Sequence, residues 1–143
     1  MSELRLYNLL RESLVWVECA GQDALAKHDL TLAQYDALRF LAEQDGQRIG
    51  ELRLRLLVDH SKMTRIADRL VTLGLVDRQP DATDRRSWRL YLTPAGHTLL
   101  SQATATHNQL ITDQFALFSP PEQQQLIELL NRLNQKMARE YTF

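Results

Sequence analysis

The hydrophobic pattern of this chain changes its period twice, and this change constrains the fold more than any other feature. Up to Gly74 the apolar side chains recur at helical spacing, as on amphipathic helices. After Gly74 the period becomes two, and "LVDR" and "WRLYL" each read as a short strand. From Thr93 the helical period returns. We therefore predict a mainly α fold that is interrupted by one two-stranded β-hairpin.

Capping residues mark the ends of the predicted helices. Thr31 and Gln34 form a capping-box pair, and Gly46 ends the helix that they open. Thr93 and Ser119 each precede a proline at the first helical position, where the missing N–H costs nothing. We expect helices in 3–27, 29–44, 49–57 and 59–73, and in the stretches that follow Thr93 and Ser119.

The order of these elements predicts a winged helix-turn-helix. Two helices that are joined by a tight turn and followed by a hairpin are typical of that motif. We assign 30–94 to a DNA-binding region of this type. We assign 1–29 and 95–143 to a helical dimerisation region, so that the chain forms one continuous domain.

Charge is distributed unevenly along the chain. The whole sequence holds 17 basic and 18 acidic residues, for a net charge of −1. The span 48–89 holds ten basic and six acidic residues, net +4, which leaves seven and twelve, net −5, elsewhere. A basic centre between acidic flanks is typical of a small nucleic-acid-binding protein. A solvated charged face is the alternative explanation.

Several classes of protein are disfavoured. No window approaches the ~18 apolar residues of a membrane span, and the acidic N-terminal stretch does not resemble a secretory signal. We expect a cytoplasmic protein. Cys19 is the only cysteine, the four histidines are scattered, and neither a phosphate-binding loop nor a nucleophile motif is present. We therefore expect no enzyme, metal or cofactor.

The polar side of the predicted fourth helix carries candidate DNA contacts. Asp59 or Ser61 is its N-cap. Early residues of such a helix reach base edges in the major groove, while longer cations bind phosphate. The alternative is an ordinary solvated helix face. The candidates are Ser61, Lys62, Thr64, Arg65 and Arg69.

The predicted hairpin tip carries a second group of candidates. Arg85 and Arg86 are placed to enter a minor groove, whose negative potential attracts guanidinium groups. We expect Asp84 to orient one of these arginines through a paired hydrogen bond. The alternative is a surface ion pair, worth only about 0–1 kcal/mol.

Five ordered motifs lie within residues 30–96: Glu51-Leu52, Arg69-Leu70, Gly74-Leu75-Val76, Asp84-Arg85-Arg86 and Leu92-Thr93-Pro94-Ala95-Gly96. With these motifs, this part of the chain resembles the MarR family, the multiple-antibiotic-resistance type of bacterial transcription regulator. The resemblance rests on five ordered motifs at the family's spacing, while the outer helices match only in length and amphipathic character. Three positions depart from the family pattern: Arg53, Leu57 and Asp59.

The resemblance implies a homodimer that binds a pseudo-palindromic site on double-stranded DNA and represses nearby genes. It also implies a small, often phenolic or aromatic, ligand that binds between the dimer helices and the winged module and relieves repression. Trp16 could line that cavity or could belong to the core. Cys19 lies too late in its helix to match the cysteine of the family's peroxide sensors. The alternative function is a winged-helix module that binds protein and not DNA.

Overall fold

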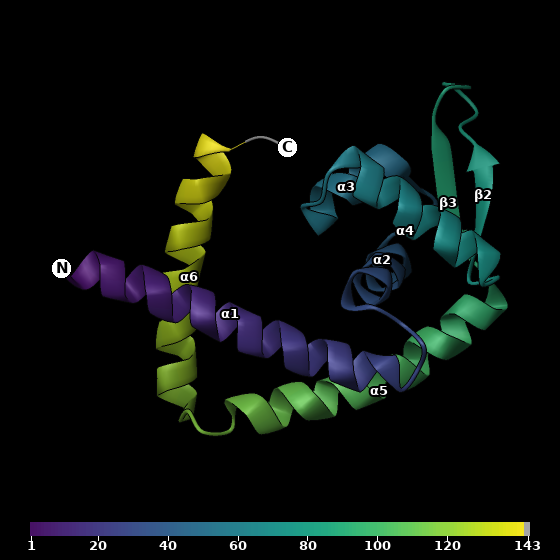
Figure 1. The fold of residues 1–143 in the computed structure, drawn as a ribbon. Coiled ribbons are helices and arrows are strands. Elements are labelled where there is room, and N and C mark those ends of the chain that lie inside the picture. Colours follow the sequence, from purple (N-terminus) through teal and green to yellow (C-terminus); the bar gives the residue numbers. More distant parts are fainter. Residues whose placement is uncertain (142–143) are drawn as a thin grey trace.

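The computed structural model describes residues 1–141, and Figure 1 shows two parts. A winged module of three short helices and a small sheet lies on one side, and the long helices α1 and α5 run beneath it. The third long helix, α6, stands at the far end. The predicted mainly α winged helix-turn-helix is confirmed. In chain order the elements are α1 (Ser2–Ala26), α2 (Leu32–Glu43), β1 (Gln47–Arg48), α3 (Ile49–Leu56), α4 (His60–Thr72), β2 (Val76–Pro80), β3 (Trp88–Leu92), α5 (Pro94–Phe115) and α6 (Pro120–Glu140).

The predicted caps hold the helix ends in place. The Thr31 and Ser119 side chains each accept a backbone N–H and form full capping boxes with the residues three positions on. Thr93 accepts the N–H of Gly96 at the start of α5. Of the two candidates for α4, the structure selects Asp59, whose carboxylate accepts the Lys62 N–H at 2.7 Å. Each cap satisfies a donor that the helix itself leaves unpaired.

The sheet has one strand more than the hairpin that the sequence predicted. Its order is β1-β3-β2, and Gln47 and Arg48 pair antiparallel with Leu90 and Arg89 of β3. The Gln47 side chain is buried, and its amide donates to the carbonyls of Phe40 and Gln44 at 2.7 and 2.9 Å. A strand of two residues has no hydrophobic period to detect. Strand β1 therefore attaches the wing, which consists of β2, β3 and the loop between them, to the start of α3.

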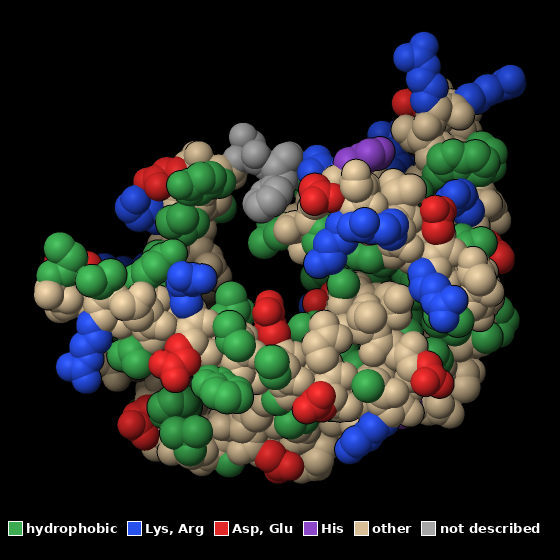
Figure 2. All heavy atoms as spheres, viewed as in Figure 1, with side chains coloured by type: hydrophobic (Ala, Val, Ile, Leu, Met, Phe, Trp, Pro, Cys, Tyr) green, Lys and Arg blue, Asp and Glu red, His purple; other side chains and the backbone are tan. Residues whose placement is uncertain are grey.

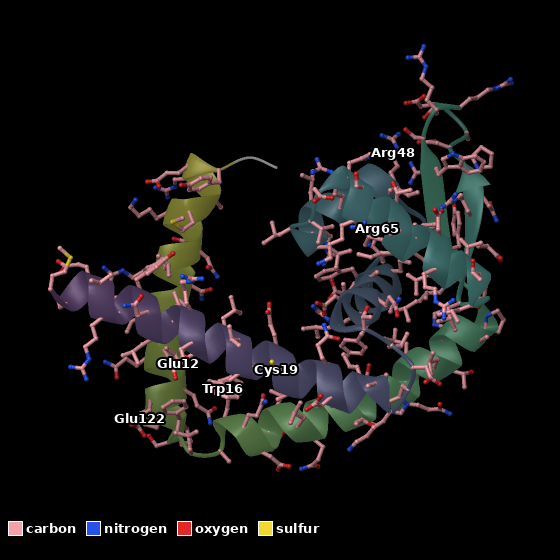
Figure 3. The ribbon with its side chains drawn as sticks, in the orientation of Figure 1. Glu12, Trp16, Cys19, Arg48, Arg65 and Glu122 are labelled. Atoms are coloured by element: carbon pink, nitrogen blue, oxygen red, sulfur yellow. The ribbon has the colours of Figure 1, made fainter. Side chains whose placement is uncertain are left out.

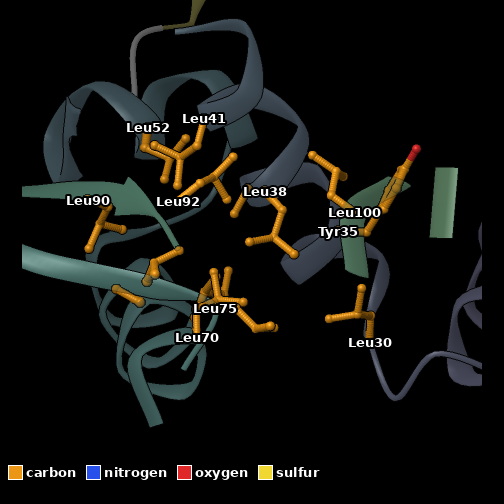
Figure 4. Close-up of a cluster of buried hydrophobic side chains, with 14 of the residues drawn as sticks. Leu30, Tyr35, Leu38, Leu41, Leu52, Leu70, Leu75, Leu90, Leu92 and Leu100 are labelled. Carbon is orange, nitrogen blue, oxygen red and sulfur yellow. The ribbon is translucent and has the colours of Figure 1, made fainter. Parts of the chain in front are cut away.

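One apolar core joins α2, α3, α4 and the sheet (Figure 4). The buried face of α4 consists of Met63, Ala67 and Leu70, all with no exposed area, and the nearly buried Ile66. Burying each large side chain of this kind contributes about 1.5–3 kcal/mol. This packing fixes the rotation of α4 about its axis. The α4 side chains meet a set from the other elements: Leu38, Leu41, Leu52, Val76 and Leu90.

The winged module is also packed on the long helices. The end of α1 buries Ala24 and Leu25, and α5 buries Leu100 and Ala103. The buried Tyr35 of α2 places its hydroxyl 3.2 Å from the Thr104 hydroxyl of α5. Beyond these contacts, the first half of α1 and all of α6 have no buried residue.

Leu57 ends α3 in an unusual backbone conformation. Its φ is +56°, in the left-handed region that glycine adopts freely and that costs other residues roughly 1–2 kcal/mol. Leu57 is one of the three positions that depart from the family pattern. Its left-handed backbone shows that a glycine would fit this turn without that cost. Gly74 follows the C-cap of α4 as predicted, with φ of +72°. Gly46 has the same φ but lies in the turn after α2, which ends at Glu43 with Gln44 as its C-cap and not at the predicted glycine.

Gly96 lies where the start of α5 comes very close to the turn between α4 and β2. A Cβ at this position would lie 2.1 Å from the Leu75 carbonyl oxygen. We expect Gly96→Ala to lower the free energy of unfolding by about 1–3 kcal/mol, because backbone must move. Gly50→Ala is the matched control, since a Cβ there meets nothing within 4 Å. Thermal unfolding measures both, and an unchanged melting temperature for Gly96→Ala would contradict the packing described.

Candidate nucleic-acid interface

The face of α4 that points away from the core carries the predicted contact residues. At 100° per residue, Ser61 and Arg65 lie opposite the buried Met63 and Leu70. Lys62, Thr64 and Arg69 flank this line and are also exposed. Arg65 lies on the winged module, on the same side of the molecule as Arg48 and far from α6 (Figure 3).

The Thr64 hydroxyl is already used within the helix. It donates to the His60 carbonyl at 3.0 Å, one turn earlier. The hydroxyl proton is therefore not free for a base acceptor, although the methyl group and the oxygen lone pairs remain exposed. Ser61 and Arg65 are left as the outward donors at the start of α4.

The wing tip is shaped by Asp84, though not as the sequence predicted. The expected bond between its carboxylate and an arginine guanidinium is absent from the described residues. Instead, the Arg86 backbone N–H donates to Asp84 Oδ1 at 3.0 Å, and the Ser87 hydroxyl donates to Oδ2 at 3.2 Å. Asx-type turns of this kind compete well for short carboxylates. Arg85 and Arg86 are exposed, and Figure 2 shows two basic side chains projecting from the tip.

Asp81 anchors the base of the wing, although it is not among the functional residues predicted from the sequence. Its side chain is only 3% exposed. It accepts the Thr83 N–H and hydroxyl at 3.2 Å and binds Arg48 Nε at 2.5 Å, with Arg89 at 3.5 Å. The Thr83 N–H bond, with the Arg48 and Arg89 guanidinium groups, lowers the Asp81 pKa to about 2. The carboxylate thus ties the wing loop to β1 and β3.

A second ion pair ties the wing to α4. Arg78 of β2 donates to Asp68 of α4 at 2.5 Å. The Arg89 guanidinium also donates to the Gly46 carbonyl at 2.6 Å, beyond its pair with Asp81. The wing is therefore bound to α4 and to the turn after α2, as well as to β1.

The ion pairs divide the basic residues of the span 48–89 into two groups. Arg48, Arg55, Arg78 and Arg89 each have an acidic partner within the winged module. Within residues 1–141, the outward cations of α4 and the wing tip have none. This second group consists of Lys62, Arg65, Arg69, Arg85 and Arg86, together with Arg53 of α3.

This arrangement agrees with comparisons to known proteins. The MarR family model matches residues 28–87. The chain is 30% identical over 106 residues to the HTH-type transcriptional regulator YkoM of Bacillus subtilis, covering 74% of this chain and 69% of that protein. It is also 30% identical over 104 residues to the homoprotocatechuate degradative operon repressor of Escherichia coli, covering 73% and 70%. The chain belongs to the MarR family.

The fold of this MarR-family regulator is shared with solved structures. A mutant of E. coli MarR in complex with operator DNA superposes with a TM-score of 0.86 at 26% identity, covering 92% of this chain and 95% of that one. BpsR of Bordetella bronchiseptica shares the fold at 23% identity, with a TM-score of 0.83 over 91% and 98%. The chain is thus a transcription regulator and not an enzyme. No helix within residues 1–141 is long and apolar enough to cross a membrane.

The depressed pKa of Asp81 gives a pH-dependent test of the wing anchor. A carboxyl whose folded pKa is about 2, below the ordinary 3.8, stabilises the fold above pH ~4 and loses that contribution as the pH falls towards 2. We expect Asp81→Asn to lower the melting temperature at neutral pH, and the gap to the native protein to narrow over this acid window. Asp77→Asn, at an exposed carboxylate of β2, is the control. A gap that stays constant with pH would contradict the anchor.

Proposed function

We propose that this protein is a homodimeric repressor that binds a pseudo-palindromic DNA site and responds to a small ligand. The observation that carries the proposal is the division of the cations. Arg48, Arg55, Arg78 and Arg89 are paired with acids within the winged module, whereas the cations on the exposed side of α4 and at the wing tip are not. Unpaired cations on two adjacent projections match the phosphate charge on either side of a DNA groove.

In this proposal α4 lies in the major groove. Ser61 and Arg65, on the outermost line of the helix, contact base edges, with the Arg65 guanidinium suited to the paired acceptors of guanine. Lys62 and Arg69 flank that line and contact phosphates. Thr64 presents its methyl group, because its hydroxyl proton is bonded within the helix.

The wing then reaches the adjacent minor groove. Arg85 and Arg86 enter it, and Asp84 sets the turn that displays them. The anchors at Asp81 and at the Arg78–Asp68 pair hold the wing at a fixed position relative to α4. A wing that is already ordered loses little conformational entropy on binding DNA.

Dimerisation is supported by the apolar stripes that the single chain leaves exposed. On α1 the stripe continues the face that is buried later in the same helix, and it holds Leu6, Leu10, Leu14 and Val17. On α6 the stripe holds Leu126, Leu129, Leu130, Leu133 and Met137, each 36–50% exposed. Stable monomers rarely expose contiguous apolar faces of this extent. A two-fold partner would cover both stripes and present two α4 helices about one turn of DNA apart.

A small phenolic or aromatic ligand is the proposed inducer. Among the similar proteins, BpsR is regulated in DNA binding by 6-hydroxynicotinic acid, and another controls a homoprotocatechuate degradative operon. Both compounds are aromatic and carry a hydroxyl and a carboxylate. We assign no residues of this chain to the ligand.

The dimer is tested by sedimentation at micromolar concentration. We expect the native protein to sediment as a dimer and Leu133→Glu to sediment as a monomer, because a charge would be buried in the apolar seam. Asn131→Glu, on the opposite side of α6, should remain dimeric. A native monomer that binds a palindromic site with full affinity would contradict the proposed assembly.

DNA binding is tested by selecting duplexes from a random pool and measuring affinity against salt. Replacing Arg85 and Arg86 by alanine should weaken binding to all sites, most of all to those with A·T-rich wing positions. It should flatten the slope of log affinity against log salt by up to about 0.9 for each phosphate-neutralising charge lost. Arg65→Ala should instead cost about 1–3 kcal/mol at one base pair and relax specificity there.

Arg39→Ala on α2, where the arginine is paired with Asp36 and Glu43, is the control and should leave the salt slope unchanged. The melting temperature of the wing variant should stay close to that of the native protein. If no duplex is selected, or if binding is insensitive to salt, the chain is a winged-helix module that binds protein.

A further inference from the structure

An open groove separates α4 from the wing. It has a volume of about 460 Å³, and its lining includes His60 and Thr64 of α4, Arg78 of β2, and Arg86, Ser87 and Trp88 of the wing. Figure 2 shows a histidine side chain at the foot of the protruding wing. The groove is open to solvent along the same side of the module as the unpaired cations.

Trp88 is an unexpected residue in this position. It begins β3 and remains 41% exposed, although an indole is among the side chains that gain most from burial. Within the module its ring faces the Arg78 guanidinium at 5.9 Å, near the limit of a cation–π contact. A half-exposed indole beside two arginines is suited to cover the apolar face of a ligand whose other face is charged.

The charge of the groove specifies the chemistry of that ligand. Its lining contains two arginines and a histidine and no carboxylate, since Asp68 is turned to its pair with Arg78. The Arg78 Nε–H is buried and has no acceptor among the described residues, so it lacks the hydrogen bond that a buried donor ordinarily makes. An anionic ligand with an apolar face fits this lining.

The proposed position of DNA places such a group in the groove. When a helix occupies the major groove and a wing occupies the adjacent minor groove, the strand between the two grooves must pass between helix and wing. A deoxyribose presents an apolar face, and the phosphates on either side of it are anionic. The groove lies in the corresponding place between α4 and the wing.

We propose that this groove binds one deoxyribose-phosphate of the strand between the two DNA grooves, with Trp88 packed on the sugar and the two lining arginines, Arg78 and Arg86, supplying positive charge around the phosphate. The inference rests on the proposed DNA binding. It adds Trp88 as a sequence-independent contact that neither the charge pattern nor the hairpin pattern indicated. It also explains why Trp88 is half-exposed in the free protein.

Tryptophan fluorescence tests the proposal, because Trp16 and Trp88 are the two tryptophans of the chain. In Trp16→Phe, Trp88 is the only reporter. On addition of a duplex selected from a random pool, we expect its emission to shift to the blue and its quenching by acrylamide to fall severalfold. Anisotropy of the labelled duplex reports binding independently. In Trp88→Phe, which keeps Trp16, the blue shift should be absent.

Affinity supplies the second measurement. Trp88→Ala should weaken binding severalfold and equally for matched and mismatched sites, since a sugar contact carries no sequence information. If the duplex binds while Trp88 remains accessible, and Trp88→Ala binds normally, the groove proposal is overturned and the proposed function stands. If the labelled duplex does not bind at all, both are overturned.

Discussion

The complete burial of one face of α4 is the constraint on which the rest of the structure depends. Met63, Ala67 and Leu70 have no exposed area, so the helix cannot rotate without exposing core side chains to water. That packing decides which residues face outward, and it places Ser61 and Arg65 at the centre of the exposed line. The buried carboxylate of Asp81 brings the wing into the same rigid frame through Arg48, Arg89 and Thr83. Helix and wing are therefore displayed as one unit.

Within residues 1–141, two surfaces of the single chain lack a partner: one is cationic and the other is apolar. They suit different kinds of partner. The cations of α4 and the wing tip lack acids, which suits a polyanion. The leucine-rich stripes of α1 and α6 lack an apolar cover, which suits a second copy of the chain. The two surfaces lie at opposite ends of the molecule (Figure 3). A ligand that altered the packing of α1 and α5 against α2 would change the position of the cationic surface relative to the apolar stripes. The Tyr35–Thr104 contact lies at this junction between α2 and α5.

Much of this arrangement could be predicted from the sequence, because its signals are local. Caps such as Thr31 and Ser119 act within one helical turn, and the exposed side of α4 follows from its period. The features that the sequence did not predict depend on contacts between residues that are distant in the chain. Strand β1 is too short to show a period, and Asp81 differs from Asp84 only in being buried beside Arg48, which is 33 positions away. The sequence signal available for Asp81 was an acid beside a proline at the end of a strand, in a span rich in arginine. The exposure of Trp88 likewise depends on where α4 lies.

Hydroxyl-radical footprinting of a selected duplex tests most directly the central claim that α4 and the wing act as one unit in each half of a dimer. We expect two half-sites centred about 10 base pairs apart on one face of the duplex. In each, backbone protection should cover the strand between a major groove and the adjacent minor groove, with loss of reactivity in that minor groove itself. A single protected half-site would contradict the dimer. Protection confined to the major groove, with the flanking minor groove as reactive as in free DNA, would contradict the role of the wing.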